Sequence, residues 1–503
     1  MTMATPDWRA AWKVVRRWLY FIHRWLGVAA CLLFVLWFAS GLTMMYVRFP
    51  RLQEAERVAH SPPIDWTRVR LDPQAAIDKA GAKAFPAGLT LSMWGDQPVY
   101  RLVAGRKRIG VSAVDGRVIG QVDADQARTV VAAAWPGASP RLLRTLERDQ
   151  WTVAQAFNAA RPLHLFALDD AAGTQIYVGS KGGEIVLDTN RTERFWNWLG
   201  AVPHWLYFTA LRSLPQAWNQ VVLWTSGVAM VSAVTGLWIG LLRVRLRKRY
   251  SGGRVSPYRG WMAWHHVSGL IGGVLVLTWV FSGWMSMSPN DWGGPGEAVI
   301  AGRAAWTASP QAPYPLDVAA LRAAGRGQDR EVQFYWLGER PLMLARELGD
   351  RQQLLDPATA RIVRLTDAEL FSRAAVLVPG ATATMRDRLT QDDAYWYSHH
   401  DKRPLPVLRI GFDDPAASWF YIDPATGRMV GVADTSLRLY RWTFSALHSL
   451  DFGFLIRHRP LWDIVVWLLS IAGLIISVSG VVIGWRRIRA DLAASRRRPT
   501  ARS

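Results

Sequence analysis

Four long stretches without charged residues separate two polar regions of the chain. The most informative stretch is Trp261–Ser288, which is long enough to cross a bilayer, because about 20 apolar residues suffice. The other three are Trp25–Val47, Ser213–Leu242 and Ile464–Trp485. We therefore predict an integral membrane protein whose four spans form an α-helical bundle.

The polar regions between the spans carry the patterns of helices and strands. The stretch DPQAAIDKAGAKAF at 72–85 predicts a helix. The segments at 99–105 and 109–120 alternate apolar and polar residues around turn residues, as strands do, and a second strand–turn–strand unit occupies 174–188. Both polar regions are therefore predicted to be α+β.

Clusters of basic residues flank the spans on one side only. They lie at 9–24, 243–249 and 486–498, and these clusters share one side of the membrane if the chain crosses it four times. The positive-inside rule assigns that side to the cytoplasm, so we expect both termini there and both polar regions outside. The predicted divisions are the cytoplasmic N-terminus and first span (1–48), external region 1 (49–200), the second span with its preceding helix (201–249), a cytoplasmic loop and third span (250–290), external region 2 (291–440), the fourth span with its preceding helix (441–487) and a cytoplasmic tail (488–503).

The two halves of the chain match each other at nearly constant spacing. Arg161-Pro162-Leu163 recurs at an offset of 242, and Tyr177 recurs as Tyr421 at an offset of 244. The other matches at 244 are Asp169-Asp170 with Asp413-Asp414 and Gly183 with Gly427. Such offsets indicate an internal duplication. Each half runs outward, forms an external region and returns, so we predict two parallel repeats about an axis along the membrane normal.

Composition refines this picture. The chain has 28 Trp residues, a type that concentrates at membrane–water interfaces, and a formal net charge of +21. The charge does not indicate nucleic-acid binding, because much of the Arg and Lys flanks the spans and no basic stripe lies elsewhere. With Cys31 as its single cysteine, the chain forms neither an intramolecular disulfide nor a cluster of thiolate ligands.

Four of the ten histidines recur in the repeat. His23 and His265 each lie 18 positions before a glycine of the same span, and His204 and His448 each lie 32 positions before a glycine of the following span. Parallel repeats place matched residues at the same depth, so His23 is expected to face His265, and His204 to face His448. Two imidazoles that approach one axis from opposite sides are suitable ligands for six-coordinate haem iron. We therefore predict two haem sites with these four axial ligands, and no catalytic side chain is assigned.

Other interpretations of the histidines stay open. Histidines in membrane helices also serve as hydrogen-bonding partners of neighbouring helices, and haem is favoured because four of them form two matched pairs. Two-histidine zinc or copper sites lack a nearby Cys or repeated carboxylate that would complete the ligand shell. His266 stays an alternative to His265, because only the repeat register separates the two.

The remaining histidines carry no assigned role. His399 and His400 lie in DDAYWYSHHD, which the first half lacks. They are compatible with a metal or substrate contact and equally with a solvated surface pair. No function is predicted for His60, His164 or His458.

Several motifs carry a resemblance to a known family. They are HRWLG (23–27) with SG at 40–41, HHVSG (265–269) with SG at 282–283, DDAYWYSHH, and the doubled strand–turn units. Over nearly the whole chain they resemble the PepSY-associated transmembrane helix family, sometimes described as iron-regulated membrane proteins. Similar members include siderophore reductases of the bacterial inner membrane that bind b-type haem through transmembrane histidines. The resemblance implies PepSY-like periplasmic regions, and haem b at His23, His204, His265 and His448.

These inferences lead to one expected function and one alternative. We expect a multi-pass protein of the bacterial inner membrane, in contact with lipid, that passes electrons to periplasmic ferric iron bound by a siderophore. No GxGxxG follows a predicted strand, so the electron donor is expected to be a separate flavoprotein or quinol. The alternative is a non-enzymatic, membrane-anchored protein whose PepSY-like regions bind a partner and whose histidines are structural.

Overall fold

Four long apolar helices dominate the computed structural model, which describes residues 8–105, 107–349, 351–399 and 401–496. They are α1 (Trp8–Met44), α8 (Pro215–Arg243), α9 (Trp261–Met285) and α16 (Leu461–Arg496). Each is long and apolar enough to cross a membrane. The prediction of four spans is confirmed.

The spans extend beyond the uncharged stretches at two of their ends. Helix α1 begins at Trp8, so the basic segment before Arg24 belongs to the same helix as the span. Helix α16 continues to Arg496, and therefore includes part of the predicted tail, while 497–503 lie outside the described residues. The reason is local, because 486–496 contain neither Gly nor Pro and are rich in the good helix formers Arg, Ala and Leu.

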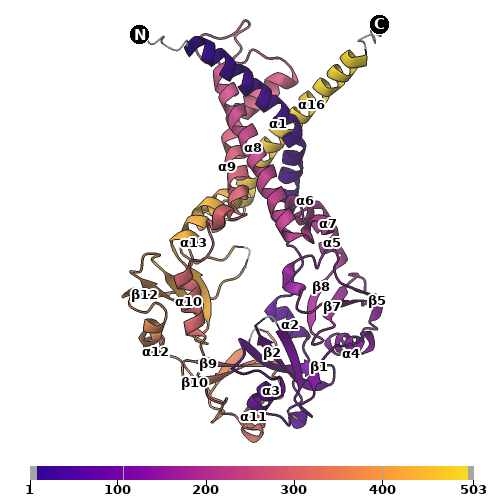
Figure 1. Cartoon of the computed structure of the whole chain (residues 1–503), viewed down its shortest axis with the longest axis vertical. Helices are drawn as coiled ribbons and strands as arrows, with labels where there is room; N and C mark the ends of the chain where they lie inside the picture. The colour runs from indigo at the N-terminus through magenta and orange to yellow at the C-terminus, as the bar shows by residue number, and fades with distance from the viewer. Residues whose placement is uncertain (1–7, 106, 350, 400, 497–503) are drawn as a thin grey trace, which may run out of the picture.

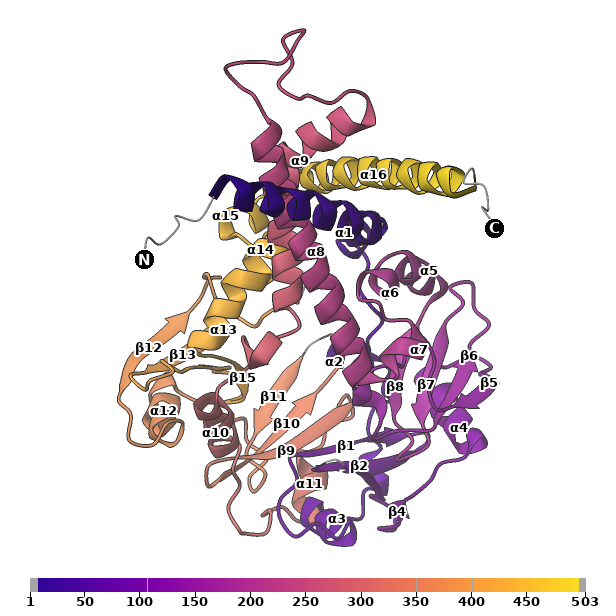
Figure 2. The same ribbon diagram turned by 45° about the horizontal axis from the view of Figure 1, so that its top comes forward.

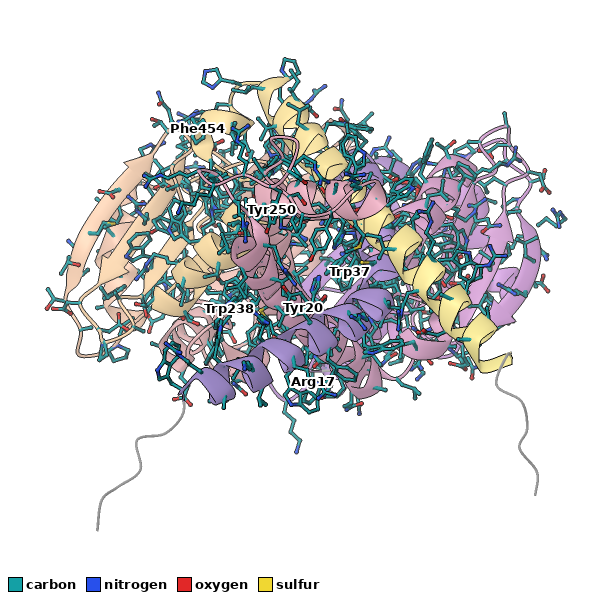
Figure 3. All side chains as sticks on the ribbon, turned by 90° about the horizontal axis from the view of Figure 1, so that it is seen from above. Arg17, Tyr20, Trp37, Trp238, Tyr250 and Phe454 are labelled. Atoms are coloured by element: carbon teal, nitrogen blue, oxygen red, sulfur yellow. The ribbon has the colours of Figure 1, made fainter. Side chains whose placement is uncertain are left out.

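The four helices form one bundle. Helix α1 packs against α8 and α16, and α9 packs against the same two helices. Small residues permit the close approach: a side chain at Gly473 of α16 would overlap the Phe38 ring of α1. Figure 3 looks down on this bundle, with Tyr20 and Trp37 of α1 near the middle of the view. The interior is apolar and aromatic, and it includes Phe34 and Val276.

A seven-stranded antiparallel sheet joins the two halves of the chain. Its strands, in spatial order, are β11 (Gln352–Leu355), β10 (Arg340–Arg346), β9 (Glu331–Leu337), β1 (Gly88–Trp94), β2 (Gln97–Ala104), β3 (Lys107–Ser112) and β4 (Val118–Ile119). In the central pair, Leu89 lies opposite Phe334 and Leu91 opposite Val332, all buried. The sequence predicts two separate external regions, whereas the structure joins them through β1 and β9. Without this pairing each of the two strands would be an exposed edge, so the pairing removes both edges.

Each half also contributes a four-stranded antiparallel sheet. The first half supplies β5 (Arg141–Leu146), β6 (Leu163–Ala167), β7 (Gln175–Gly179) and β8 (Ile185–Thr189), and the second supplies β12 (Ala383–Leu389), β13 (Val407–Phe412), β14 (Trp419–Ile422) and β15 (Met429–Ala433). The strands predicted within 99–120 and 174–188 are therefore present as β2–β4 and as β7 and β8.

Short helices cover these sheets and connect them to the bundle. They are α2 (Glu54–His60), α3 (Pro73–Lys79), α4 (Ala124–Ala134), α5 (Arg191–Leu199), α6 (Ala201–His204), α7 (Thr209–Arg212), α10 (Glu297–Trp306), α11 (Val318–Ala324), α12 (Asp367–Ser372), α13 (Thr435–Tyr440), α14 (Leu447–Ser449) and α15 (Gly453–Ile456). Helix α3 is shorter than the predicted 72–85, because Gly81 adopts the left-handed conformation (φ 69°) just after it.

The two kinds of structure occupy opposite ends of the molecule. The start of α1, the end of α16 and the connection between α8 and α9 lie at one end of the bundle, and all three sheets lie beyond the other end (Figure 1). Figure 2 shows the same separation after rotation, with α1 and α16 above the sheets in the view.

Candidate functional site

The helix bundle and the short helices α6 and α14 bring the recurring histidines together in two pairs. His23 of α1 and His265 of α9 form the inner pair, with ring centroids 6.2 Å apart and planes at 34°. His204, the last residue of α6, and His448 of α14 form the outer pair, with centroids 6.1 Å apart and planes at 74°. Both pairings are the ones that the repeat register predicts.

The spacing of both pairs fits a shared metal. Imidazole nitrogen binds metal at about 2.0–2.1 Å, and a five-membered ring with bonds near 1.35 Å holds its nitrogen about 1.1 Å from the centroid. Two imidazoles on opposite sides of one metal therefore have centroids about 6.2–6.4 Å apart. The observed separation of the inner pair, 6.2 Å, is at the lower end of this range, and that of the outer pair, 6.1 Å, lies just below it. The four residues thus fit bis-histidine ligation of haem iron.

Hydrogen bonds orient the rings of the inner pair. His23 Nδ1 donates to the carbonyl of Ser232 (3.0 Å), and His265 Nδ1 donates to the carbonyl of Ile476 (3.1 Å) and also lies 3.1 Å from Ser479 Oγ. A proton held on Nδ1 leaves the lone pair on Nε2, which is the arrangement of metal-binding histidines.

The outer pair is held in the same way. His204 Nδ1 lies 3.2 Å from the Trp37 carbonyl and 3.1 Å from Ser40 Oγ, and His448 Nδ1 lies 3.0 Å from Ser282 Oγ. Both residues lie outside the four spans. Burial lowers the pKa of His204 to about 3 and that of His448 to about 4, so both imidazoles are neutral, as metal ligands must be.

Each of the four rings lies against a glycine of a neighbouring segment. A Cβ at Gly236 would lie 2.6 Å from His23 Cε1, and one at Gly480 would lie 3.3 Å from His265 Cε1. For the outer pair the corresponding distances are 3.4 Å from Gly41 to His204 and 3.5 Å from Gly283 to His448. These glycines provide the room in which the rings sit.

The same contacts give the separation of the two pairs. His204 packs on Gly41, which lies 18 residues after His23 in one continuous helix. At a rise of 1.5 Å per residue this corresponds to about 27 Å along α1. The pairs therefore occupy opposite ends of the bundle, and the outer pair is the one nearer the sheets.

Irregular backbone accompanies both outer histidines. Leu206 and Leu450, each two residues after its histidine, adopt left-handed φ angles of 52°. A π-helical segment, Arg441–Ala446, precedes His448, and the ring of Phe444 from this segment stacks on His448 with centroids 5.1 Å apart. Both features are uncommon and cluster at functional sites.

The other histidines lie elsewhere. His266 is turned away from the inner pair, with Nε2 3.1 Å from the Gly240 carbonyl, so the structure places His265 opposite His23. His399 Nδ1 lies 2.7 Å from Asp451 Oδ1, and both side chains are buried, whereas His400 lies outside the described residues. Three further histidines have separate contacts: His60 stacks on Trp135, His164 bonds the Val122 carbonyl, and His458 bonds the Phe454 carbonyl.

In the sequence, the Ser-Gly dipeptides at 40–41 and 282–283 belong to the motifs of the family resemblance but do not indicate a contact with a histidine. In the structure, the serine of each dipeptide contacts Nδ1 of an outer histidine, and the glycine makes room for the ring. Ser479-Gly480 does the same for His265. A hydroxyl residue followed by glycine recurs in all four spans, at 40–41, 235–236, 282–283 and 479–480, and this recurrence is the signal that could have found these residues.

Comparison with known proteins identifies one family. The family model described as the PepSY-associated TM region matches residues 20–365 and 352–503, which together cover most of the chain. No curated protein matches the chain.

Proposed function

Because the chain belongs to the family of PepSY-associated TM regions, we propose that it is a haem-binding reductase of the bacterial inner membrane. It passes electrons to periplasmic ferric iron held by a siderophore. The observation that carries this proposal is the pair of imidazole separations, 6.2 and 6.1 Å, which suit a metal held between two histidines.

The four histidines would hold two haem b groups, one at the inner pair and one at the outer pair. When bound there, haem supplies one-electron redox chemistry. The carbonyls of Ser232, Ile476 and Trp37 keep the proton on Nδ1 and so keep Nε2 available. The apolar core between the pairs, which includes Phe34 and Phe38, excludes water from the interior of the bundle.

The orientation in the membrane is part of the proposal. Clusters of Arg and Lys at 9–24, 243–249 and 486–496 are in segments at the bundle end far from the sheets (Figure 1). The positive-inside rule assigns this end to the cytoplasm and the sheets to the periplasm. The inner pair then lies near the cytoplasmic surface, and the outer pair near the periplasmic surface.

A duplication of the chain would explain why both pairs form. The offset of 242 between His23 and His265, and of 244 between His204 and His448, is the offset that relates the spans and sheets of the two halves. Two parallel repeats would place equivalent side chains on opposite sides of a common axis at equal depth.

The electron balance requires a donor and an acceptor. Each ferric ion takes up one electron, and the resulting ferrous ion is held less tightly by hard oxygen ligands, so reduction favours its release. The donor is proposed to be a separate quinol or reduced flavoprotein that reaches the inner pair. The chain's part is to hold the two redox sites at fixed depths across the membrane.

The absorbance spectrum of the purified full chain tests this proposal. We expect a Soret band of low-spin haem at two haems per chain, and reoxidation of the reduced protein by a ferric siderophore with appearance of Fe(II). A protein without haem would favour the non-enzymatic alternative with structural histidines. A haem protein that no ferric chelate reoxidises would contradict the reductase function but not the haem sites.

A further inference from the structure

A pocket of about 490 Å³ opens in the first half between its four-stranded sheet and α5. Arg144, Leu165 and Gln175 line it from the strands, Arg194 and Trp198 from α5, and Trp151 from the loop between β5 and β6. Its volume lies within the range of small-molecule sites, roughly 300–1,000 Å³.

The second half fills the equivalent position with one of its own side chains. Gln175 pairs with Ala167 and Thr189 in its sheet, and Trp419 pairs with Gly411 and Ala433, so the two residues hold the same place, 244 positions apart. The Trp419 indole therefore occupies space that Gln175 leaves open.

The surroundings of Trp419 indicate what this position accepts. The guanidinium groups of Arg438 and Arg409 lie over its ring, at 4.2 and 5.0 Å from the centroid, and the ring of Tyr395 meets it edge-on at 5.3 Å. Arg194 is the equivalent of Arg438, because Arg194 donates to the Gly173 carbonyl as Arg438 does to the Ala417 carbonyl, 244 positions on. Trp151 is the equivalent of Tyr395, because the backbone N–H of each donates to an aspartate two residues before it, Asp149 or Asp393. The open pocket thus keeps a cation and an aromatic ring at the place where a planar aromatic group would lie.

Charge makes an anionic ligand the better fit. The guanidinium of Arg194 donates to oxygens of Thr189 and Gly173, which are neutral acceptors. Arg144 is exposed at the pocket, and its contact with Asp149 is long, 3.9 Å. Asp149 itself already accepts from the Tyr177 hydroxyl at 2.7 Å. The guanidinium groups of Arg144 and Arg194 outnumber the single carboxylate of Asp149, which already accepts a hydrogen bond. The charge that faces the pocket is therefore net positive.

The pocket is connected to the outer histidine pair through packed rings. The ring centroid of Trp205, which follows His204, lies 5.9 Å from that of Phe49. The centroid of Phe49 lies 6.0 Å from that of Trp151 at the pocket. A ligand in the pocket would therefore contact an aromatic cluster that reaches the residue next to His204.

We propose that this pocket binds the aromatic, anionic arm of a ferric catecholate complex. The choice of a catecholate as the substrate class rests on the proposed reductase function, whereas the binding of an aromatic anion rests on the pocket alone. A catecholate supplies a flat ring for Arg194 and Trp151 and negative oxygens for Arg144. A hydroxamate offers no ring and binds less well.

Calorimetric titration of the full chain in detergent tests the site without electron transfer. The probe is the redox-inert gallium(III) complex of 2,3-dihydroxybenzoate, with gallium(III) acetohydroxamate as the comparison ligand. The wild-type chain is expected to bind the first at least about tenfold more tightly, because only it carries a ring that Arg and Trp can contact. Equal affinity for both complexes, or no binding of the catecholate complex, would overturn the proposal.

Three variants localise the binding. Gln175→Trp copies the second half, fills the pocket and is expected to weaken binding at least about tenfold, since the ligand ring loses its space. Gln352→Trp, also at the first residue of a strand but in the separate seven-stranded sheet, is the matched control and should bind like wild type. Arg144→Gln should weaken binding about fivefold through loss of one exposed charge. Wild-type affinity of the Gln175→Trp protein would contradict the assigned pocket.

The same variants separate this proposal from the reductase function. If Gln175→Trp abolishes binding but the wild-type protein with haem is not reoxidised by the ferric complex, the pocket stands and the reductase function fails. If ferric catecholate reoxidises wild type and Gln175→Trp at the same rate, the reductase function stands and the pocket is refuted.

Discussion

Replacement of Gly236 by alanine tests how the inner histidine is held. The added Cβ would lie 2.6 Å from His23 Cε1 and 3.1 Å from Nδ1, whereas ordinary van der Waals contact begins near 3.4 Å. The imidazole must therefore retreat by the difference, 0.8 Å. Such a shift strains the 3.0 Å hydrogen bond to the Ser232 carbonyl and the 6.2 Å separation from His265.

The energetic cost follows from overpacking. An extra methyl group in a packed interior costs about 1–3 kcal/mol, and loss of the hydrogen bond adds about 0.5–1.5 kcal/mol. The helix itself gains about 0.5–1 kcal/mol when alanine replaces glycine. The net change is therefore destabilising and concentrated on the inner pair.

Two further glycines serve as controls for this prediction. Gly227 lies on the same helix with no heavy atom within 4 Å of an added Cβ, so Gly227→Ala should leave both haem sites unchanged and raise thermal stability slightly. Gly283 leaves 3.5 Å to His448 Cε1, an ordinary contact, so Gly283→Ala should retain the outer haem.

The assay is the haem content per purified chain, together with the thermal unfolding midpoint. Gly236→Ala is expected to retain close to one haem, the outer one, and to unfold at a lower temperature than Gly227→Ala. Two haems with an unchanged Soret band in Gly236→Ala would refute the contact between Gly236 and His23. An unfolding midpoint equal to that of Gly227→Ala would refute it even in a protein without haem.

Three other predictions address the ligands, the joined sheets and the topology. Alanine in place of either inner histidine should remove the same haem, and alanine at either outer histidine should remove the other, whereas His60→Ala should leave the spectrum intact; loss of different haems within one pair would contradict the pairing. Glu331 is buried, and burial alone raises its pKa. Its ion pairs with Arg57 and Arg346 outweigh burial and bring the pKa below the ordinary value. The stability that Glu331 contributes is therefore present above about pH 4.5 and is lost as pH falls through the lowered pKa. Glu331→Gln should therefore cost about 3–5 kcal/mol near neutral pH and reduce the acid sensitivity of unfolding, and the exposed Glu339→Gln should do neither; denaturant titration from pH 3 to 7 measures both. Reporter fusions at residue 120 should be active in the periplasm and fusions at the C-terminus in the cytoplasm, and a periplasmic C-terminus would reject the orientation.

Local pattern predicted the elements of the fold well. An uncharged apolar run as long as a bilayer is thick has few alternatives to a membrane helix, which is why all four spans are present in the structure. The strands around 99–120 and 174–188 were similarly readable from alternation and turn residues. The extension of α16 through a basic segment was missed, because charge marks the membrane boundary but does not end a helix.

The candidate site could be predicted in part because the two halves of the sequence match each other. Matched positions of His23 and His265, and of His204 and His448, predicted which imidazoles share a depth, and the structure brings both pairs within contact distance. The choice between His265 and His266 needed the structure, since neighbouring helix residues differ by about 100° in direction and packing decides which of them faces the axis.

Contacts between distant segments depended on the tertiary structure alone. Pairing of β1 with β9 merges two regions that look separate in the sequence. The register of this pair depends on both strands together and so cannot be read from either strand alone. Each histidine ring rests on a glycine of another segment, and the open pocket beside Gln175 exists only because Trp151 and α5 converge on it. Periodicity in a sequence records which face of an element is apolar, whereas the partner of that face is chosen by the free energy of packing the whole chain.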